Sequence, residues 1–401
     1  MKKDKKLNHP ILFFISKLLV RPVAYFKWGY RYKDKYKIAK DEKVCVISNH
    51  QTDYDPILIH LSFNKFLRCL ATDNIFAGKF TSKLLRYIGV IPKRKGIVDL
   101  RSNMEMLNAT QKGDSLLFFP EGNRSYAEFQ FYVSNRLPKI IKKFETTLII
   151  FNIHGGFGRF PRIGNKPRKG KFYGEIKKVL RYEEYKDMPD DELFEIIQNN
   201  LKTFDYQLGE KYLSNQKAEY FEREFFYCPK CHKTQTIYSK GNYLKCSNCD
   251  LEVEYKEDLS LESKDPSIKY HRLLDWYNDQ IDYINKTDFS KMNQIFIDHN
   301  VTLKLSNPYD KCIIITKHSE MILTNKELIF NNRKFEIKDI KIASPVSGRK
   351  LCFTIGDNNY VVRGDKRFNA LKYVLLFNKL DTEMKLSKND NYFTLIKEEQ
   401  Q

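Results

Sequence analysis

Short apolar runs alternate with longer amphipathic stretches between Val44 and Leu180. Four of these runs are bounded by polar residues or glycine and predict buried strands, at residues 44–48, 66–72, 115–122 and 146–153. Helical periodicity lies between them, at residues 56–63, 80–89 and 98–113, and residues 175–182 predict one more strand. Strands that alternate with helices in this way predict an α/β domain, with a mixed sheet flanked by helices.

The pattern changes after this region. Residues 189–208 carry apolar side chains at helical spacing and predict one amphipathic helix, and residues 271–286 predict another. Short apolar runs separated by turns recur between residues 300 and 363, and a helical stretch follows at 367–380. Several strands closed by one C-terminal helix resemble a pleckstrin-homology-like (PH-like) barrel, so we expect a β-rich C-terminal domain.

Positive charge is concentrated near the N-terminus. The 401 residues carry 70 Lys and Arg against 50 Asp and Glu, a net charge of +20 that implies an acidic partner. Residues 1–43 contribute thirteen basic and four acidic side chains. Their apolar stretch, residues 11–20, is broken by Lys17 and is half the length of about 20 residues that a membrane span needs. The mixture of apolar, aromatic and cationic side chains predicts an interfacial anchor on an anionic membrane surface.

Two other interpretations of residues 1–43 stay open. A secretory signal would have this apolar length, but Arg21, Pro22 and a run of aromatic residues stand where a small-residue cleavage site is needed. A buried N-terminal helix with a solvated basic tail is the second alternative. Without a signal peptide the default is a reducing environment, so we expect a peripheral or monotopic protein on the cytoplasmic face of the cell membrane.

Four of the eight cysteines form a spaced set. Cys228 and Cys231 make one Cys-x2-Cys pair, and Cys246 and Cys249 make a second pair after a gap of fourteen residues. Such spacing is typical of a zinc ribbon, in which four thiolates fill a tetrahedral site. Because no coordination position stays open, we expect one structural zinc ion and no catalytic cofactor.

The stretch ISNHQTDYDP, residues 47–56, places His50 at the end of a predicted strand and Asp55 at the start of a predicted helix. Strand ends are common positions of active sites in α/β sheets. Residues five apart do not share a face of a continuous helix, so the two meet only if the loop folds back. Asp55 would then hold Nδ1–H of His50 and leave Nε2 as a base. Asp55 also stands at the N-cap position of the predicted helix, and the two roles are compatible because one carboxylate oxygen can cap the helix while the other accepts from His50.

Two further stretches place arginines after strands. GVIPKR ends at Arg94, and FPEGNRS contains Glu121, Gly122 and Arg124. Two arginines from neighbouring strand-end loops could hold a phosphate by bidentate hydrogen bonds, although each arginine alone is typical of a solvated surface.

Together the three stretches resemble the phospholipid/glycerol acyltransferase family, specifically the 1-acyl-glycerol-3-phosphate acyltransferases. NHQTDYD matches the NHxxxxD motif of that family, GVIPKR its glycine-to-arginine motif and FPEGNRS its FPEGTRS motif, in the same order and spacing over about residues 10–210. The resemblance implies that His50 is the catalytic base and Asp55 its partner. It also implies that the phosphate-bearing acceptor is bound by Arg94, Glu121, Gly122 and Arg124.

The implied reaction is a direct acyl transfer in phospholipid biosynthesis. His50 removes the proton from the free hydroxyl of lysophosphatidate as it attacks a thioester donor, either acyl-CoA or acyl-acyl carrier protein. A covalent route through Ser48 has no supporting signature. The chain departs from the family in its fourth motif, where Phe151 and Asn152 stand in place of a proline. Another lysophospholipid acceptor is therefore an alternative within the same reaction class.

An alternative from a different class is a nucleic-acid-binding zinc-ribbon protein. Residues 224–256 carry five Lys and no Arg against four Asp and Glu, which is a poor phosphate-binding footprint, so we do not expect nucleic acid as a partner. A non-catalytic lipid-binding scaffold built on the C-terminal domain is the third possibility.

These patterns divide the chain into six predicted parts. They are a basic membrane-anchoring segment (1–43), the acyltransferase domain (44–215), the zinc ribbon (224–256), a helical linker (257–299), the β-rich domain (300–385) and a polar tail (386–401).

Overall fold

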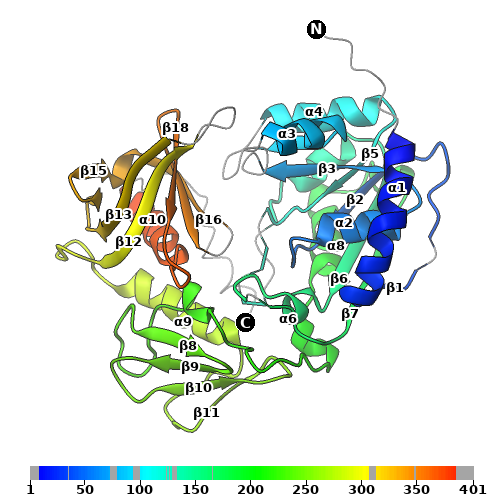
Figure 1. Ribbon diagram of the computed structural model, residues 1–401. Coiled ribbons are helices and arrows are strands. Elements are labelled where there is room, and N and C mark those ends of the chain that lie inside the picture. Colours follow the sequence, from blue (N-terminus) through cyan, green and yellow to red (C-terminus); the bar gives the residue numbers. More distant parts are fainter. Residues whose placement is uncertain are drawn as a thin grey trace. The chain divides into compact units, whose positions relative to one another are not determined.

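The computed structural model describes residues 9–34, 36–72, 79–93, 100–122, 124–125, 127–128, 133–164, 166–306, 313–346 and 349–384. The chain forms two compact units (Figure 1). The first comprises Met1–Pro161 and Lys169–Tyr212, and the second comprises Arg162–Arg168 and Leu213–Gln401. Each helix within the described ranges is too short or too polar to span a bilayer.

The first unit is built on a seven-stranded sheet in the order β1-β7-β6-β2-β5-β3-β4. The last five strands of that order run parallel, β7 is antiparallel to β6, and β1 is parallel to β7. The sheet is therefore mixed, as the sequence predicts. Its strands are β1 Tyr30–Tyr32, β2 Val44–Ser48, β3 Leu67–Thr72, β4 Ile91–Lys93, β5 Ser115–Phe118, β6 Thr147–His154 and β7 Phe172–Leu180.

Helices pack on both faces of this sheet. Because successive strand side chains point to opposite faces, Cys45 and Ile47 join one core cluster while Val44 and Val46 join the other. The first cluster includes residues of α4, α5 and α8, and the second includes residues of α2 and Ala24. The helices are α1 His9–Pro22, the π-helix η1 Val23–Lys27, α2 Asp55–Ser62, α3 Lys79–Tyr87, α4 Leu100–Gln111, α5 Leu137–Lys142, α6 Gly156–Arg159, α7 Tyr182–Tyr185, α8 Asp190–Leu201 and the 3-10 helix η3 Asp205–Leu208.

The single helix predicted at residues 189–208 is wrong. The α-helix ends at Leu201, and only a short 3-10 turn follows at Asp205–Leu208. The physical reason is that the side chains of Thr203 and Asp205 accept hydrogen bonds from Asn49, after β2, and from the Gly155 amide, after β6. A continued helix would carry both side chains away from these donors.

The second unit contains two antiparallel sheets. The smaller has the strand order β11-β10-β9-β8, and the larger has the order β15-β14-β13-β12-β18-β17-β16. A helix, α10 Leu371–Met384, follows the last strand, so the expected β-rich region with one C-terminal helix is present; its likeness to a PH-like barrel stays a prediction. The remaining elements are η4 Phe221–Arg223, β8 Ile237–Lys240, β9 Tyr243–Cys246, β10 Glu252–Tyr255, β11 Leu261–Ser263, α9 Leu273–Lys286, β12 Phe296–Ser306, β13 Ile313–Leu323, β14 Glu327–Phe330, β15 Arg333–Glu336, η5 Ile337–Asp339, β16 Ile340–Val346, β17 Lys350–Ile355 and β18 Asn358–Arg363.

The region predicted as a helical linker, residues 257–299, is part of this packed unit. Strand β11 adds to the sheet of the cysteine module, and Trp276 Nε1 on α9 donates to the carbonyl oxygen of Tyr227 at 2.9 Å. A fully buried tryptophan fixes α9 on the module, which a linker would not do. The predicted boundaries at 43 and 215 also differ from the observed units, because β1 joins the sheet and residues 162–168 belong to the second unit. The predicted tail at 386–401 lies outside the described residues.

Candidate active site

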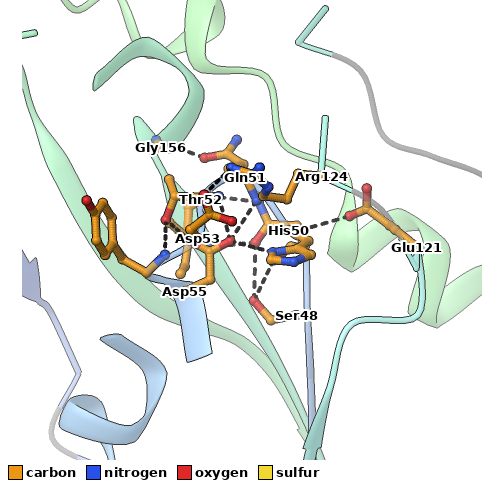
Figure 2. A network of polar contacts seen from close by, with 12 residues as sticks. Ser48, His50, Gln51, Thr52, Asp53, Asp55, Glu121, Arg124 and Gly156 are labelled. Carbon is orange, nitrogen blue, oxygen red and sulfur yellow. Dashed lines mark hydrogen bonds and ion pairs between the residues drawn. The ribbon is translucent and has the colours of Figure 1, made fainter. Parts of the chain in front are cut away.

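Three neighbouring parallel strands, β6, β2 and β5, end at the same edge of the first sheet. The residues that follow these strands form the site: Asn49 and His50 come directly after β2, Glu121 comes three residues after the end of β5, and the glycine pair at 155–156 comes directly after β6. Carboxyl ends of adjacent parallel strands bring such loops together. Figure 2 shows that residues of these three loops gather around His50.

The predicted contact between His50 and Asp55 is present. Nδ1 of His50 lies 2.9 Å from Oδ2 of Asp55, and that same oxygen accepts hydrogen bonds from the backbone N–H groups of Gln51 (2.7 Å) and Thr52 (2.8 Å). Asp55 is completely buried, and its other oxygen, Oδ1, accepts a hydrogen bond from the Thr52 hydroxyl, so four hydrogen bonds hold the side chain. Because Asp55 acts only as an acceptor, Nδ1 carries the proton and Nε2 of neutral His50 is free to accept one.

The predicted N-cap role of Asp55 is wrong. Asp55 is the first helical residue of α2, and the cap position is Tyr54, which makes no side-chain capping bond. The carboxylate bonds backbone N–H groups that precede the helix instead of those in its first turn. The role of Asp55 is therefore to fold the loop 50–55 back upon itself.

The loop after β5 holds His50 from the other side (Figure 2). The backbone N–H of His50 donates to Oε1 of Glu121 at 3.2 Å, and the backbone N–H of Ser125 donates to the carbonyl oxygen of His50 at 3.1 Å. The His50 ring stacks on Phe119, with ring centroids 4.1 Å apart. Glu121, predicted to bind substrate, thus also fixes the backbone of the candidate base.

Arg124 is brought close to the site, and its guanidinium pairs with Asp53, Nη1 to Oδ2, at 3.0 Å. The side chain of Asp53 is 75% exposed, and nothing in the sequence indicates its pairing with Arg124. Gly122 has a φ of +66°, a left-handed conformation that glycine adopts without strain, in agreement with the predicted tight turn. Arg94, the other predicted phosphate ligand, lies outside the described residues.

Four site residues have no role in the sequence prediction. Asn49 donates to the carbonyl oxygen of Ile153 (2.8 Å) and to Thr203 Oγ1 (2.7 Å), which ties the end of β2 to β6 and to the segment after α8. Gln51 Nε2 donates to Asp205 Oδ1 at 3.2 Å. Asn49 and Gln51 stand within the quoted motif, but nothing near Thr203 or Asp205 in the sequence marks them, because their partners lie about 150 residues away.

The site contains a small cavity lined in part by His50. The His50 side chain is 20% exposed, so a ligand can reach the candidate base. The lining of the cavity is polar apart from one leucine, and comprises Asn49, His50, Gln51, Glu121, Ser125, Glu128, Leu201 and Thr203. Ser48 is fully buried with its hydroxyl donated to the carbonyl oxygen of Asn49, which is an unsuitable position for a nucleophile. Phe151 and Asn152, which depart from the fourth motif, are also fully buried within β6.

The four spaced cysteines converge in the second unit. Their sulfur atoms all lie within 4.8 Å of one another, and the pairs Cys228–Cys249 and Cys231–Cys246 are 3.7 and 3.8 Å apart. Four thiolates at about 2.3 Å from a tetrahedral zinc ion would be about 3.8 Å apart, so the donor set and its spacing fit this metal. The backbone N–H of Asn248 donates to Cys246 Sγ at 3.3 Å, which orients one ligand.

Residues 30–156 match the family model described as Acyltransferase. A crystal structure of the 1-acyl-sn-glycerophosphate (LPA) acyltransferase PlsC from Thermotoga maritima is similar to 48% of this chain and 93% of its own, with 16% identity and a TM-score of 0.38. No curated protein sequence matches the chain.

Proposed function

We propose that this protein transfers a fatty acyl group from a thioester donor to the free hydroxyl of lysophosphatidate, and the match of residues 30–156 to the acyltransferase family model supports the reaction class. The observation that carries the proposal is the His50–Asp55 pair, because the bond from Nδ1 to Asp55 leaves Nε2 as the base and His50 lines a small polar cavity at the edge of the sheet. The donor is acyl-CoA or acyl-acyl carrier protein, and the product belongs to phospholipid biosynthesis.

In the proposed mechanism His50 is the general base. Nε2 takes the proton of the acceptor hydroxyl as its oxygen attacks the thioester carbon, the carbon–sulfur bond breaks, and the proton passes to the departing thiolate. The buried Asp55 stabilises the imidazolium that forms in between, and its hydrogen bonds from Gln51 and Thr52 keep it from rotating. Positioned proton transfer of this kind supplies roughly 10²- to 10⁴-fold of rate.

The direct test is an assay for phosphatidate. Purified protein is incubated with radiolabelled acyl-CoA and lysophosphatidate in mixed micelles, and the lipids are separated. Formation of phosphatidate supports the proposal, and lysophosphatidylcholine and lysophosphatidylethanolamine in parallel reactions distinguish lysophosphatidate from other acceptors. A retarded DNA or RNA band without acyl transfer would favour the nucleic-acid-binding alternative.

We expect Arg124 to bind the acceptor phosphate, because its guanidinium lies at the site and its ion pair with Asp53, a carboxylate that is largely in solvent, is weak enough to be exchanged for a phosphate. Replacing Arg124→Gln should raise the KM for lysophosphatidate about tenfold, the cost of one charge-assisted hydrogen bond, with a smaller change in kcat. The matched variant Asp53→Asn removes the competing anion and should leave that KM unchanged or lower it. An Arg124→Gln enzyme with wild-type KM for lysophosphatidate would contradict this role.

Membrane attachment through α1 and η1 is part of the proposal. Leu18 and Leu19 are each 67% exposed and Phe26 is 82% exposed, an apolar surface that water alone does not favour. Lys17, which interrupts the apolar run, donates its Nζ to the carbonyl oxygen of Phe63 and is thereby directed into the fold. Burial and the nearby Arg21 lower the pKa of Lys17.

The triple variant Leu18→Ser, Leu19→Ser, Phe26→Ser should bind vesicles of anionic phospholipid at least about a hundredfold more weakly, because each lost apolar side chain removes roughly 1.5–3 kcal/mol of burial. Co-sedimentation with vesicles measures the change. The control Met104→Ser, at an exposed methionine of α4, should bind as the wild type does. Equal sedimentation of the triple variant and the wild type would refute this anchor and its assignment to the cytoplasmic membrane face.

A further inference from the structure

Four neighbouring strands of the larger sheet in the second unit, β13, β12, β18 and β17, carry basic side chains without acidic ones (Figure 1). Their residues 301–306, 313–319, 350–355 and 358–363 include four Lys or Arg and no Asp or Glu. Charges of both signs are normally interspersed on a solvated protein surface. An excess of one sign over neighbouring strands therefore points to a partner of the opposite sign.

The strand register places three of these cations on one face of the sheet. Lys350 on β17 lies directly opposite Arg363 on β18, and Lys304 on β12 lies opposite Val361, two positions before Arg363. Val362, which alternates with them, is completely buried on the other face, whereas Arg363 is exposed and the two lysines are partly exposed. Opposed Cβ atoms are about 5 Å apart and diagonal ones about 7–8 Å, so the three cations form one cluster.

The cluster opposes folding in the absence of a ligand. Like charges directly opposite each other on adjacent strands, as at Lys350 and Arg363, destabilise a sheet. Among the residues that the structure describes, neither these two side chains nor Lys304 has a hydrogen-bond or ion-pair partner. Asp365, two residues beyond Arg363, accepts a hydrogen bond from the backbone N–H of Arg367 at 2.7 Å. Cations that repel one another and lack a counter-ion nearby are expected where a ligand supplies the counter-ion.

Apolar side chains border the same cluster. Ile314 on β13 lies opposite Lys304 and is 45% exposed, and the adjacent Ile313 is 63% exposed. Cations beside exposed aliphatic side chains are typical of surfaces that lie at a membrane interface. A nucleic acid would instead favour aromatic rings for base stacking, and the aromatic residues of β17 and β18, Phe353 and Tyr360, stack on each other with centroids 5.1 Å apart on the opposite face.

We propose that this cationic face, defined by Lys304, Lys350, Arg363 and Ile314, binds the anionic headgroups of a phospholipid membrane. The lipid phosphates supply the counter-ions, and the isoleucines enter the boundary between headgroups and acyl chains. The cationic face shares no residue with α1 and η1, and its binding to lipid does not depend on which reaction the first unit catalyses.

The test is co-sedimentation of the full-length protein with vesicles of phosphatidylglycerol and phosphatidylcholine. It is carried out in the background of the triple serine variant of α1 and η1, so that binding through those helices does not mask the second unit. The further changes Lys304→Gln, Lys350→Gln and Arg363→Gln should together weaken binding about a hundredfold at low salt, because each cation near an anionic surface contributes about fivefold. Binding by the parent should fall as salt is added, and should be absent with phosphatidylcholine alone.

A matched control removes the same charge elsewhere in the sheet region. Lys326→Gln, Lys334→Gln and Lys338→Gln together replace three exposed lysines, of which the second and third pair with glutamates, and should bind as the parent does. Lys350→Glu gives a second, independent measurement. It replaces a repulsion by an ion pair with Arg363, so it should raise Tm by about 1–3 °C while it weakens vesicle binding. A purely structural lysine would not change stability and binding in opposite directions.

Equal vesicle binding by the Lys304, Lys350 and Arg363 variant and its parent would overturn the cationic face, as would undiminished binding to phosphatidylcholine alone. An oligonucleotide that binds the parent, is lost in the same variant and is not matched by vesicle binding would assign the face to nucleic acid instead. Acyl transfer is not measured in this experiment, so an inactive wild type would refute the proposed function and leave the cationic face in place.

Discussion

His50→Ala should lose acyl transfer by a factor of at least about 10³ while the protein remains folded. The reason is that Nε2 is the atom left free by the bond between Nδ1 and Asp55, and alanine offers no base in its place. The ring packs against Phe119 but is partly exposed, so its removal leaves a gap at the surface and not in a core. The measurement is phosphatidate formation at saturating donor, with circular dichroism as the check on folding.

The companion variant Asp55→Asn tests the charge of the Asp55 side chain separately from its size. An amide keeps the size of the carboxylate but loses the charge that stabilises imidazolium, so we expect kcat to fall by about 10²–10⁴. As a control, His299→Ala removes a histidine that is 67% exposed in the second unit and pairs with Glu320, and it should retain wild-type activity. Full activity in purified His50→Ala would exclude His50 as the base and remove the central support for the proposed mechanism.

Removal of the metal should unfold the cysteine module. We propose that one structural zinc ion is held by Cys228, Cys231, Cys246 and Cys249, whose mutual sulfur distances fit four zinc–sulfur bonds. Structural zinc supplies about 10–16 kcal/mol of apparent binding free energy to modules of this kind, more than such a module gains from its apolar contacts. A strong chelator should therefore lower the melting temperature of the second unit and expose Trp276, which is monitored by its fluorescence.

Elemental analysis gives the stoichiometry, for which we expect one zinc per chain. Cys228→Ser should abolish zinc retention, whereas Cys352→Ser, at a thiol outside the set, should retain one equivalent. Purified protein that contains no metal and melts identically with and without chelator would disprove the structural role.

The candidate base could be predicted from the sequence because its partners are local. His50 and Asp55 lie within one strand–loop–helix unit, and a turn of six residues constrains how they can meet. The cysteines are predictable for the same reason, since each Cys-x2-Cys pair forms its half of the site within four residues. The buried strands β2, β3 and β6 followed from their apolar runs to within one residue at each end, because a strand buried on both faces needs apolar side chains throughout, whereas the strand predicted at 115–122 ends at Phe118.

The helix predicted over residues 189–208 shows where such reasoning stops. Phe204 and Leu208 continue the apolar spacing of α8, yet Thr203 and Asp205 are drawn out of it by Asn49 and by the amides of Gly155 and Gly158. Burial raises the pKa of Asp205, and those hydrogen bonds oppose the shift. Periodicity records which residues are apolar, but not which polar residue will find a buried donor elsewhere in the chain.

The sequence by itself therefore determined the α/β class of the first unit, the His50–Asp55 pair and the four-cysteine set, because each depends on contacts between residues near one another in the chain. Only the tertiary structure decided that Arg124 pairs with Asp53, that Asp205 holds the glycines after β6, and that Arg168 is buried in the second unit. These contacts depend on the order of strands in the sheet and on the path of the chain between the units. Local side-chain pattern carries no information on either.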